Sequence, residues 1–247
     1  MLYLSEFLGT LLLVLLGNGV VYSVSAKRMF ANQPGKWVVI ALAWGLAVFV
    51  GVVVASSLGG PAHLNPAVTV FSLISGKFAN PSELAYIPLQ ILGAMTAQII
   101  LNFINWKHIG ETDLASVRGA HATGPAFSNK KEKATIFNFS YELVGTLVLV
   151  GVIFAFGKGG NKEALSHLGP LPVTLLVMSI GMSLGSSTGY AINPARDLGP
   201  RIVYFAMEKL LLTARKEEHV GGNFEYGWVP AVAPLLGGAI IGALALI

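Results

Sequence analysis

The tripeptide Asn-Pro-Ala occurs twice in this chain, beginning at Asn65 and at Asn193, and each copy closes an apolar stretch that is rich in glycine. Proline suits the first position of a helix, because its missing N–H would be unpaired there, and asparagine before it is a good N-cap. Each copy therefore predicts a helix that begins inside a hydrophobic region. Two such breaks at matching places in two halves of a chain indicate a binding or permeation site at the middle of a membrane.

The chemistry available at these breaks is that of a polar path for a small solute. The start of each half-helix leaves unpaired N–H groups and a partial positive charge, and Asn65 and Asn193 would offer amide donors at the midpoint. A neutral solute can exchange water for such groups, whereas a cation or a relayed proton meets two positive helix ends. The loop segments before the breaks would present backbone carbonyls, from Ala62, His63 and Leu64 in one half and from Gly189, Ala191 and Ile192 in the other. Taken alone, one copy could simply cap a kinked core helix, and His63 could line the path or lock its loop.

Arg196 follows the second break, where the first copy has Val68. An arginine within a span is costly and usually faces an aqueous cavity; its donors can bind hydroxyl groups or water while its charge repels cations. The alternative is a salt bridge to Asp197. We favour the pore role, because Asp197 and Arg201 lie four residues apart on the expected helix and can pair with each other.

Two acidic residues, Glu6 and Glu142, lie in or near spans. Such a residue can relay protons, or it can accept hydrogen bonds from the N–H groups that a broken loop leaves unpaired. Glu6 and Glu142 occupy matching positions in the two halves, which favours the structural role of accepting loop N–H groups. We expect Asp197 to support its loop in the same way. Trp44, within a span, is by itself more typical of a core or an interface than of a site.

The composition is that of an integral membrane protein. Of 247 residues, 54% are hydrophobic and 11% charged, with a mean hydropathy of +0.68, whereas soluble domains carry roughly 25% charged residues. The net charge of +4 comes without a polybasic run, so nucleic acid is not an expected partner. There is no cysteine and hence no disulfide, and no metal-ligand or nucleophile–base set, so we expect no metal, no cofactor and no enzyme.

The elements that must position the breaks follow from hydropathy, because a span needs about 20 mostly apolar residues. The first is expected to be retained rather than cleaved as a signal peptide, since no basic segment precedes it. A polar loop is expected over 107–133 and a turn over 159–162. The chain thus reads as one channel domain, with a first repeat over 1–106, a loop over 107–135 and a second repeat over 136–247. Spans are predicted over 7–26, 37–58, 84–106, 136–157, 168–185 and 226–247, with half-helices over 66–75 and 194–206.

The two halves repeat each other. The pattern Glu-x-x-Gly-Thr-Leu begins at Glu6 and again at Glu142, each time at the opening of a half. Three spans separate the two copies, so the second half must enter the membrane from the opposite side. The predicted fold class is therefore an all-α integral membrane protein with six transmembrane helices and two re-entrant half-helices in an inverted repeat.

Together these residues resemble the major intrinsic protein family, the aquaporins and glycerol facilitators, over the whole chain. The motifs that carry the resemblance run from His63 to Thr69 and from Asn193 to Arg201. Asp197, Arg201 and the Pro-Ala pair at Pro230 resemble the glycerol-conducting branch and its bacterial members. The resemblance implies a homotetramer in the cell membrane, with both termini in the cytoplasm and one pore per subunit for glycerol, water and other small polyols or neutral solutes.

The resemblance also implies a selectivity ring of Trp44, Gly181, Tyr190 and Arg196. Water-only members carry histidine at the position of Gly181, so glycine here is expected to open the ring. Trp44 and Tyr190 would then form an apolar corner for a carbon chain, opposite the donors of Arg196. Two residues depart from the family pattern: Tyr190 replaces the phenylalanine of well-known glycerol channels, and Pro61 stands where glycine is frequent.

The distribution of basic residues opposes the orientation that the resemblance implies. Loops expected inside would carry few of them, and loops expected outside many more, against the positive-inside trend. We retain the family orientation, because some of these charges lie in the longest loops. The inside set is Lys77, Lys158 and Lys162; the outside set includes Lys27, Arg28, Lys36, Lys107, Lys130, Lys131, Lys133, Lys209, Arg215 and Lys216.

Function is expected to be passive conduction of glycerol and other small neutral solutes, with water, and exclusion of ions and protons. Inverted repeats and broken helices also occur in secondary active transporters, but the chain has no membrane-embedded acidic cluster beyond Glu6 and Glu142. A channel of the same fold for water or a small undissociated acid such as lactic acid is another alternative, and a junction protein a third. The sequence does not rank glycerol against urea, small acids, peroxide or ammonia.

Overall fold

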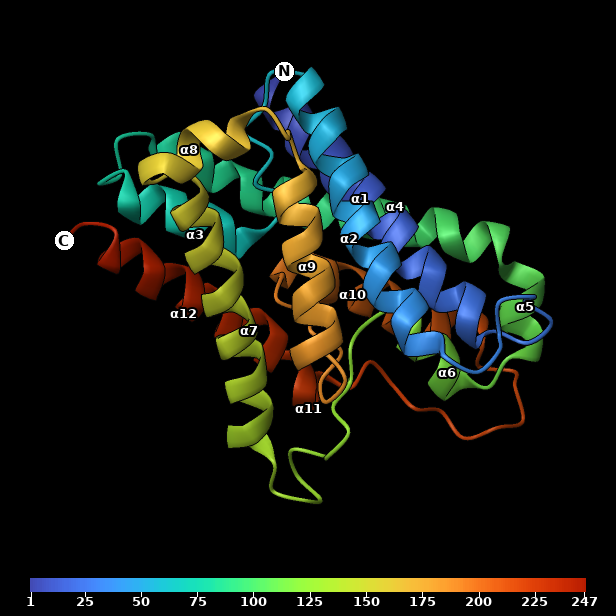
Figure 1. Cartoon of the computed structure of the whole chain (residues 1–247). Helices are drawn as coiled ribbons and strands as arrows, with labels where there is room; N and C mark the ends of the chain where they lie inside the picture. Colours follow the sequence, from blue (N-terminus) through green and yellow to red (C-terminus); the bar gives the residue numbers. More distant parts are fainter.

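The computed structural model describes residues 1–247, which fold into helices without a β-strand (Figure 1). Long apolar helices alternate with two helices that begin at the Asn-Pro breaks. The elements are α1 (Leu2–Ser25), α2 (Lys36–Ser57), α3 (Pro66–Ser75), the 3-10 helix η1 (Pro81–Ala85), α4 (Tyr86–Ile104), α5 (Trp106–Glu111), α6 (Leu114–Gly119), α7 (Thr135–Phe156), α8 (Gly159–Ser166), α9 (Leu171–Leu184), α10 (Pro194–Leu211), α11 (Phe224–Gly227) and α12 (Val229–Leu244).

The predicted fold class is confirmed, and the helices fall close to the predicted spans. Five helical segments are long and apolar enough to cross a membrane, namely α1, α2, η1 with α4, α7, and α11 with α12. The sixth span is α9, which is shorter and is followed by an extended segment that reaches Asn193. The half-helix α3 has the predicted bounds.

Three local predictions were wrong. The segment 107–133 is not simply a loop, because α5 and α6 form there; Asp113 caps α6 by accepting a hydrogen bond from the Ser116 N–H at 2.8 Å. The turn expected over 159–162 is the start of α8, which bends by 108° into α9 at Gly169 and Pro170. The half-helix α10 continues to Leu211 instead of ending near 206, since residues 207–211 are good helix formers with no proline or glycine among them.

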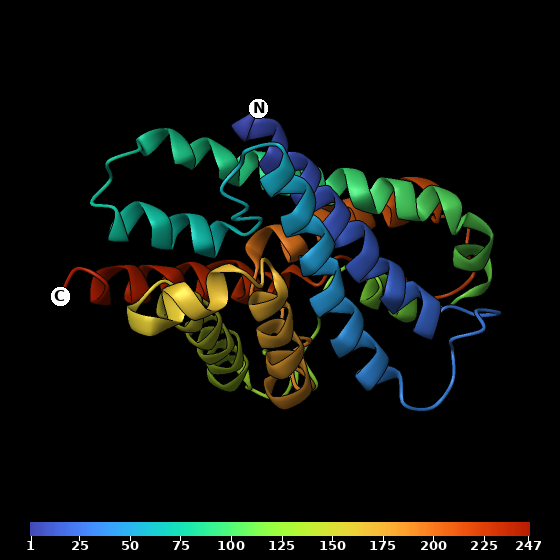
Figure 2. The same ribbon diagram turned by 45° about the horizontal axis from the view of Figure 1, so that its top comes forward.

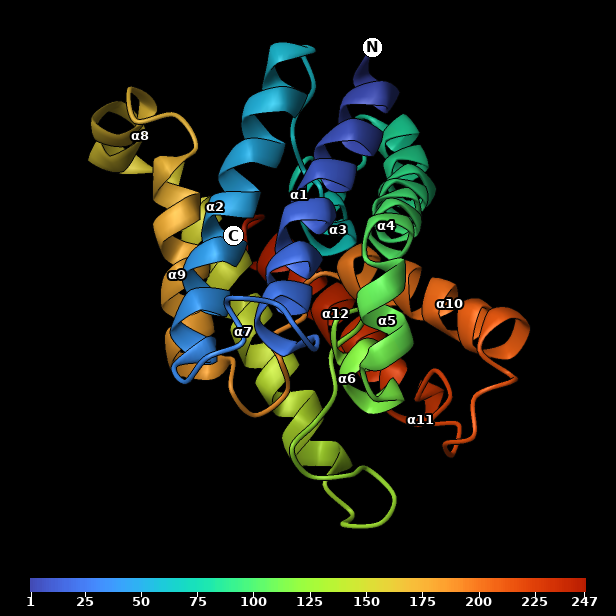
Figure 3. The same cartoon turned by 90° about the vertical axis from the view of Figure 1, so that its right-hand side faces the viewer.

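Packing follows the inverted repeat. In the first half α1 packs against α2 and α4, and in the second half α7 packs against α9 and α12. The half-helices are exchanged, because α3 packs against α12 and α10 against α4, while α2 and α9 join the halves (Figures 2 and 3). The two breaks therefore meet in the middle of the molecule, each supported by the opposite half.

The outer surface is apolar and many of the buried residues are polar, which is the arrangement expected in a lipid environment. Phe103 on α4 and Ile136 on α7 are 83% and 69% exposed, whereas Glu6, Gln90 and Glu142 are fully buried. Several of the buried polar groups, including Glu6 and Glu142, lie beside the two breaks, where their hydrogen bonds hold irregular backbone in place.

Candidate functional site

The two asparagines join the broken loops to each other. The side-chain Oδ1 of Asn65 caps α3 by accepting from the N–H of Ala67 at 2.9 Å, and that of Asn193 caps α10 by accepting from Ala195 at 3.0 Å. Each Nδ2 donates across the break, from Asn65 to the carbonyl of Ile192 and from Asn193 to that of Leu64, both at 2.8 Å. Because an amide nitrogen has two hydrogens, each asparagine keeps one donor for the cavity that both residues line.

The loops before the breaks hold their backbone in an unusual conformation. Ala62 and Leu64 have φ of 54° and 51°, and Tyr190 and Ile192, at the equivalent positions, have φ of 36° and 42°. Left-handed backbone at such residues costs on the order of 1–3 kcal/mol each and persists only where the surroundings enforce it. The chain therefore accepts strain in both loops at the same positions.

Glu6 and Glu142 hold these strained loops. The carboxylate of Glu6 accepts from the N–H groups of His63 and Leu64, both at 2.7 Å. That of Glu142 accepts from Ala191 at 3.1 Å and from Ile192 at 2.9 Å. Both carboxylates therefore accept hydrogen bonds from loop N–H groups, as the structural interpretation of these residues expects.

The glycine of the repeated Glu-x-x-Gly-Thr pattern makes room for the same loops. A Cβ on Gly9 would lie 2.5 Å from Leu64, and one on Gly145 would lie 3.0 Å from Ile192. In each half the glutamate binds the loop backbone, and the glycine one turn later lets a loop side chain approach the helix. The repeated pattern is thus a device for supporting a broken helix.

A cavity of about 810 Å³ runs along this site. It begins at the turn between α8 and α9, where Lys162 and Pro170 line it, passes Val52, and reaches both asparagines. Of its 31 lining residues, 18 are hydrophobic. The predicted loop residues Ala62, His63, Leu64, Ala191 and Ile192 line the cavity, and so does Pro61.

The far end of the cavity brings together Trp44, Tyr190 and Arg196. The guanidinium of Arg196 lies over the indole of Trp44, 4.1 Å from its centroid. Three polar atoms here are buried without a protein partner: Nε1 of Trp44, the hydroxyl oxygen of Tyr190 and Nη1 of Arg196. Buried polar atoms are normally hydrogen-bonded, so a cluster of unpartnered ones at a cavity end is suited to a passing hydroxyl group or water.

Two of the predicted lining residues lie behind the cavity wall. Gly181 is not among the lining residues, because the ring of Tyr190 covers it: a Cβ on Gly181 would lie 2.8 Å from the ring. Gly189 is likewise off the wall and faces Thr123, which lies 3.0 Å from where its Cβ would be. The room that Gly181 leaves is thus taken up by Tyr190 rather than left open to a solute.

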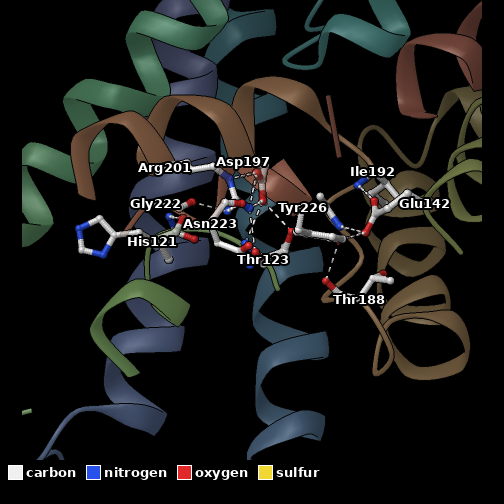
Figure 4. A network of polar contacts seen from close by, with 12 residues as sticks. His121, Thr123, Glu142, Thr188, Ile192, Asp197, Arg201, Gly222, Asn223 and Tyr226 are labelled. Carbon is white, nitrogen blue, oxygen red and sulfur yellow. Dashed lines mark hydrogen bonds and ion pairs between the residues drawn. The ribbon is translucent and has the colours of Figure 1, made fainter. Parts of the chain in front are cut away.

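A network of buried polar contacts supports the second break (Figure 4). Asp197 pairs with Arg201 at 2.7 Å and accepts from the N–H of Thr123 at 2.8 Å. Arg201 in turn donates to the carbonyls of Thr123 and Gly222, both at 2.8 Å. Tyr226 extends the network toward Glu142, 3.5 Å from its hydroxyl. Because Asp197 is engaged by Arg201, Arg196 is left free of a salt bridge.

Sequence reasoning missed several of these supporting residues. Gln90 donates to Glu6 at 2.8 Å and to Thr69 at 3.0 Å, and His63 lies 3.2 Å from the same Thr69 hydroxyl. Thr123 and Tyr226 lie far along the chain from the motifs that they support. A polar residue inside a span, such as Gln90, was the only available indication.

An inverted repeat whose two half-helices meet at a cavity, in a bundle with an apolar outer surface, defines a membrane pore protein. The Major intrinsic protein family matches residues 2–246, and the chain belongs to this family.

Its similarity to individual members extends over nearly the whole length. The chain is 47% identical over 247 residues to the probable glycerol uptake facilitator protein of Mycoplasmoides gallisepticum, covering 99% of this chain and 96% of the relative. It is 43% identical over 242 residues to glycerol uptake facilitator protein 3 of Lactiplantibacillus plantarum, covering 98% and 93%. The X-ray structure of the aquaglyceroporin from Plasmodium falciparum aligns with a TM-score of 0.77 at 29% identity, covering 98% of this chain and 93% of that one.

Proposed function

We propose that this protein is a passive channel for glycerol, with other small neutral solutes and water, and that it excludes ions and protons. The observation that carries the proposal is the cavity end lined by Trp44, Tyr190 and Arg196, where the buried guanidinium lies beside two aromatic rings and its Nη1 has no partner in the protein. A polyol presents hydroxyl groups along a carbon chain, so it can bind such donors and rest its carbons on the rings. The names of the similar bacterial proteins support the same solute.

Ion exclusion rests on charge. Two helix N-termini, each equivalent to about +0.5 elementary charge, face each other at Asn65 and Asn193, and the buried guanidinium of Arg196 adds a full charge. No carboxylate balances it in the lining, because no aspartate or glutamate is among the cavity residues. A cation would lose its hydration against three positive centres, whereas a neutral solute meets no such barrier.

We further propose that the chain forms a homotetramer in the cell membrane with both termini in the cytoplasm. The six spans place the termini on the same side, and the cavity opens beside α8 on that side. The apolar outer surface offers area both to lipid and to neighbouring copies.

The function is tested by stopped-flow light scattering on proteoliposomes that contain the purified protein. Glycerol influx is expected to exceed that of empty liposomes, to rise linearly with concentration, and to be unchanged by a protonophore or by removing sodium. Saturable influx that requires an ion gradient would point to a secondary transporter, and negligible flux of every solute to a junction protein. Running urea and undissociated lactic acid in parallel ranks the solutes.

A further inference from the structure

The position of Tyr190 is determined by its neighbours on α9. Gly181 and Gly185 lie one turn apart on this helix and its cap, and together they leave a smooth face against which the phenol ring packs. A Cβ on Gly181 would lie 2.9 Å from the Tyr190 hydroxyl, and one on Gly185 would lie 2.5 Å from its Cδ1. The ring therefore has no free space on the α9 side.

Trp37, at the start of α2, holds the same ring from another direction. Its indole Nε1 donates to the carbonyl of Gly181 at 2.9 Å, which ties α2 to α9 where these helices pack together (Figures 1 and 3). Its ring meets Tyr190 edge to face, with centroids 5.8 Å apart and planes at 71°. Trp37 does not line the cavity, whereas Tyr190 does, so Trp37 contacts the ring from behind the wall.

Tyr190 needs such support. Its backbone is left-handed, with φ of 36°, and its buried hydroxyl has no hydrogen-bond partner in the protein. Neither feature fixes the ring, so its position depends on packing against Gly181, Gly185 and Trp37. A retreat of the ring toward the position of Trp37 would widen the end of the cavity opposite Arg196.

We propose that Trp37 is a positioning residue that sets the size limit of the pore by holding the Tyr190 ring against α9. This deepens the proposed function, on which it rests, by assigning a specificity role to a residue outside the cavity. Removing Trp37 leaves a void behind Tyr190 into which the ring can move, and the pore then accepts wider polyols.

The test compares a four-carbon alditol, erythritol, with glycerol in proteoliposomes. In Trp37→Ala the ratio of erythritol to glycerol permeability is expected to rise about fivefold, which is within the range of coupling between residues in contact. Trp37→Phe keeps an aromatic edge but loses the indole N–H, so its ratio should rise less. The matched control is Trp228→Ala, which removes a half-exposed tryptophan packed on Phe139 and should leave the ratio unchanged.

A double-mutant cycle distinguishes an effect of Trp37 that acts through the Tyr190 ring from a general loss of packing around the pore. If Trp37 acts through Tyr190, then Trp37→Ala changes the ratio in the wild type but has no further effect in a Tyr190→Ala background. An additive effect, or an equal change of both fluxes in a Trp37→Phe protein that retains its assembly and helical content, would overturn the proposal.

An experimental structure of the Trp37→Ala protein decides the same question without any transport assay. Displacement of the Tyr190 ring toward the vacated space supports the proposal, and an unmoved ring refutes it. If the wild type conducts no glycerol, the proposed function fails, while the ring position in this structure still decides whether Trp37 holds Tyr190.

Discussion

Arg196 is a buried cation with no carboxylate of its own. Its neighbour Asp197 is bound to Arg201 and Thr123, its guanidinium lies over Trp44, and one of its nitrogens has no partner. At 4 Å and an effective dielectric constant of 20, a unit charge repels another by about 4 kcal/mol. An uncompensated charge at this end of the cavity would therefore repel a cation that approached it.

Replacing Arg196 by valine, the residue at the equivalent place in the first repeat, should weaken this barrier. Glycerol flux is expected to stay within a few-fold of wild type, while a proton leak appears that a pH-sensitive dye in potassium-clamped proteoliposomes would detect. If the variant conducts glycerol and shows no proton leak, the exclusion of protons would be assigned to the helix N-termini alone.

Gly181 affects the cavity through the ring of Tyr190, which packs against it. Since a Cβ there would meet the Tyr190 ring at 2.8 Å, Gly181→Ala should push the ring into the cavity and reduce glycerol permeability about tenfold, equivalent to roughly 1.4 kcal/mol, with a smaller loss for water. Gly110→Ala, where nothing lies within 4 Å, is the control. Equal losses of both fluxes in Gly181→Ala would indicate general closure.

At the scale of elements, each broken span depends on a glutamate from a different helix. Glu142 on α7 accepts two loop N–H groups just before α10 begins, as Glu6 on α1 does before α3. Hydrogen bonds to charged groups contribute about 1.5–3 kcal/mol each. The carboxylates therefore stabilise the loops from which both half-helices start.

Glu142→Gln should destabilise the second loop by about 2–4 kcal/mol, because its amide nitrogen would face a loop N–H donor instead of accepting from it. Thermal unfolding in detergent should begin at a lower temperature, and glycerol flux should fall. If the glutamate were a proton relay instead, the variant would unfold like the wild type and lose only proton-dependent transport.

The Asp197–Arg201 pair is the corresponding anchor for α10. Both side chains are fully buried, and breaking a buried pair by removing one partner costs roughly 3–5 kcal/mol. Asp197→Asn should therefore lower the unfolding temperature markedly. Arg28→Ala, which breaks the exposed pair with Glu111, should leave it almost unchanged, since surface pairs contribute about 0–1 kcal/mol; similar shifts for the two would show that Arg201 is satisfied without Asp197.

For the whole molecule, the lack of cysteine means that any thiol introduced by mutation is the only one in the chain. Labelling of that thiol can therefore report the orientation of the chain in the membrane. Wild-type flux should be insensitive to mercurials. In Val52→Cys, whose side chain lines the cavity, a thiol reagent should block flux, whereas Val38→Cys on the exposed face of α2 should not respond. With the termini in the cytoplasm, an impermeant reagent should label Ser166→Cys, at the cavity mouth, only from inside; labelling from outside would reverse the orientation.

The distribution of basic residues makes the orientation of the chain worth testing by this labelling experiment. More of them lie on the loops of the α5–α6 side than on the α8 side, opposite to the usual trend. Some are held by the fold rather than free: Arg215 donates to the carbonyls of Ile109 and Thr112, and Arg28 pairs with Glu111. For Arg28 and Arg215, these contacts with α5 and the residue after it give a reason for their location that does not depend on membrane insertion.

The membrane class, the inverted repeat and the starting points of both half-helices could be predicted from the amino-acid sequence alone. These features depend on local physics: hydropathy over about 20 residues, and the capping of a helix by Asn-Pro within a few residues. It also indicated which residues surround the path, because Asn65, Asn193, Trp44, Tyr190 and Arg196 all reach the cavity.

Only the tertiary structure decided which surface each of these residues presents and what supports it. Gly181 was predicted to open the pore, yet Tyr190 covers it, because the direction of that side chain also depends on Trp37 of α2, which is distant in sequence. The amide of Asn65 donates to Ile192 and that of Asn193 donates to Leu64, so these hydrogen bonds likewise join opposite halves of the chain. Such contacts form only when the two repeats pack together, so no local pattern encodes them.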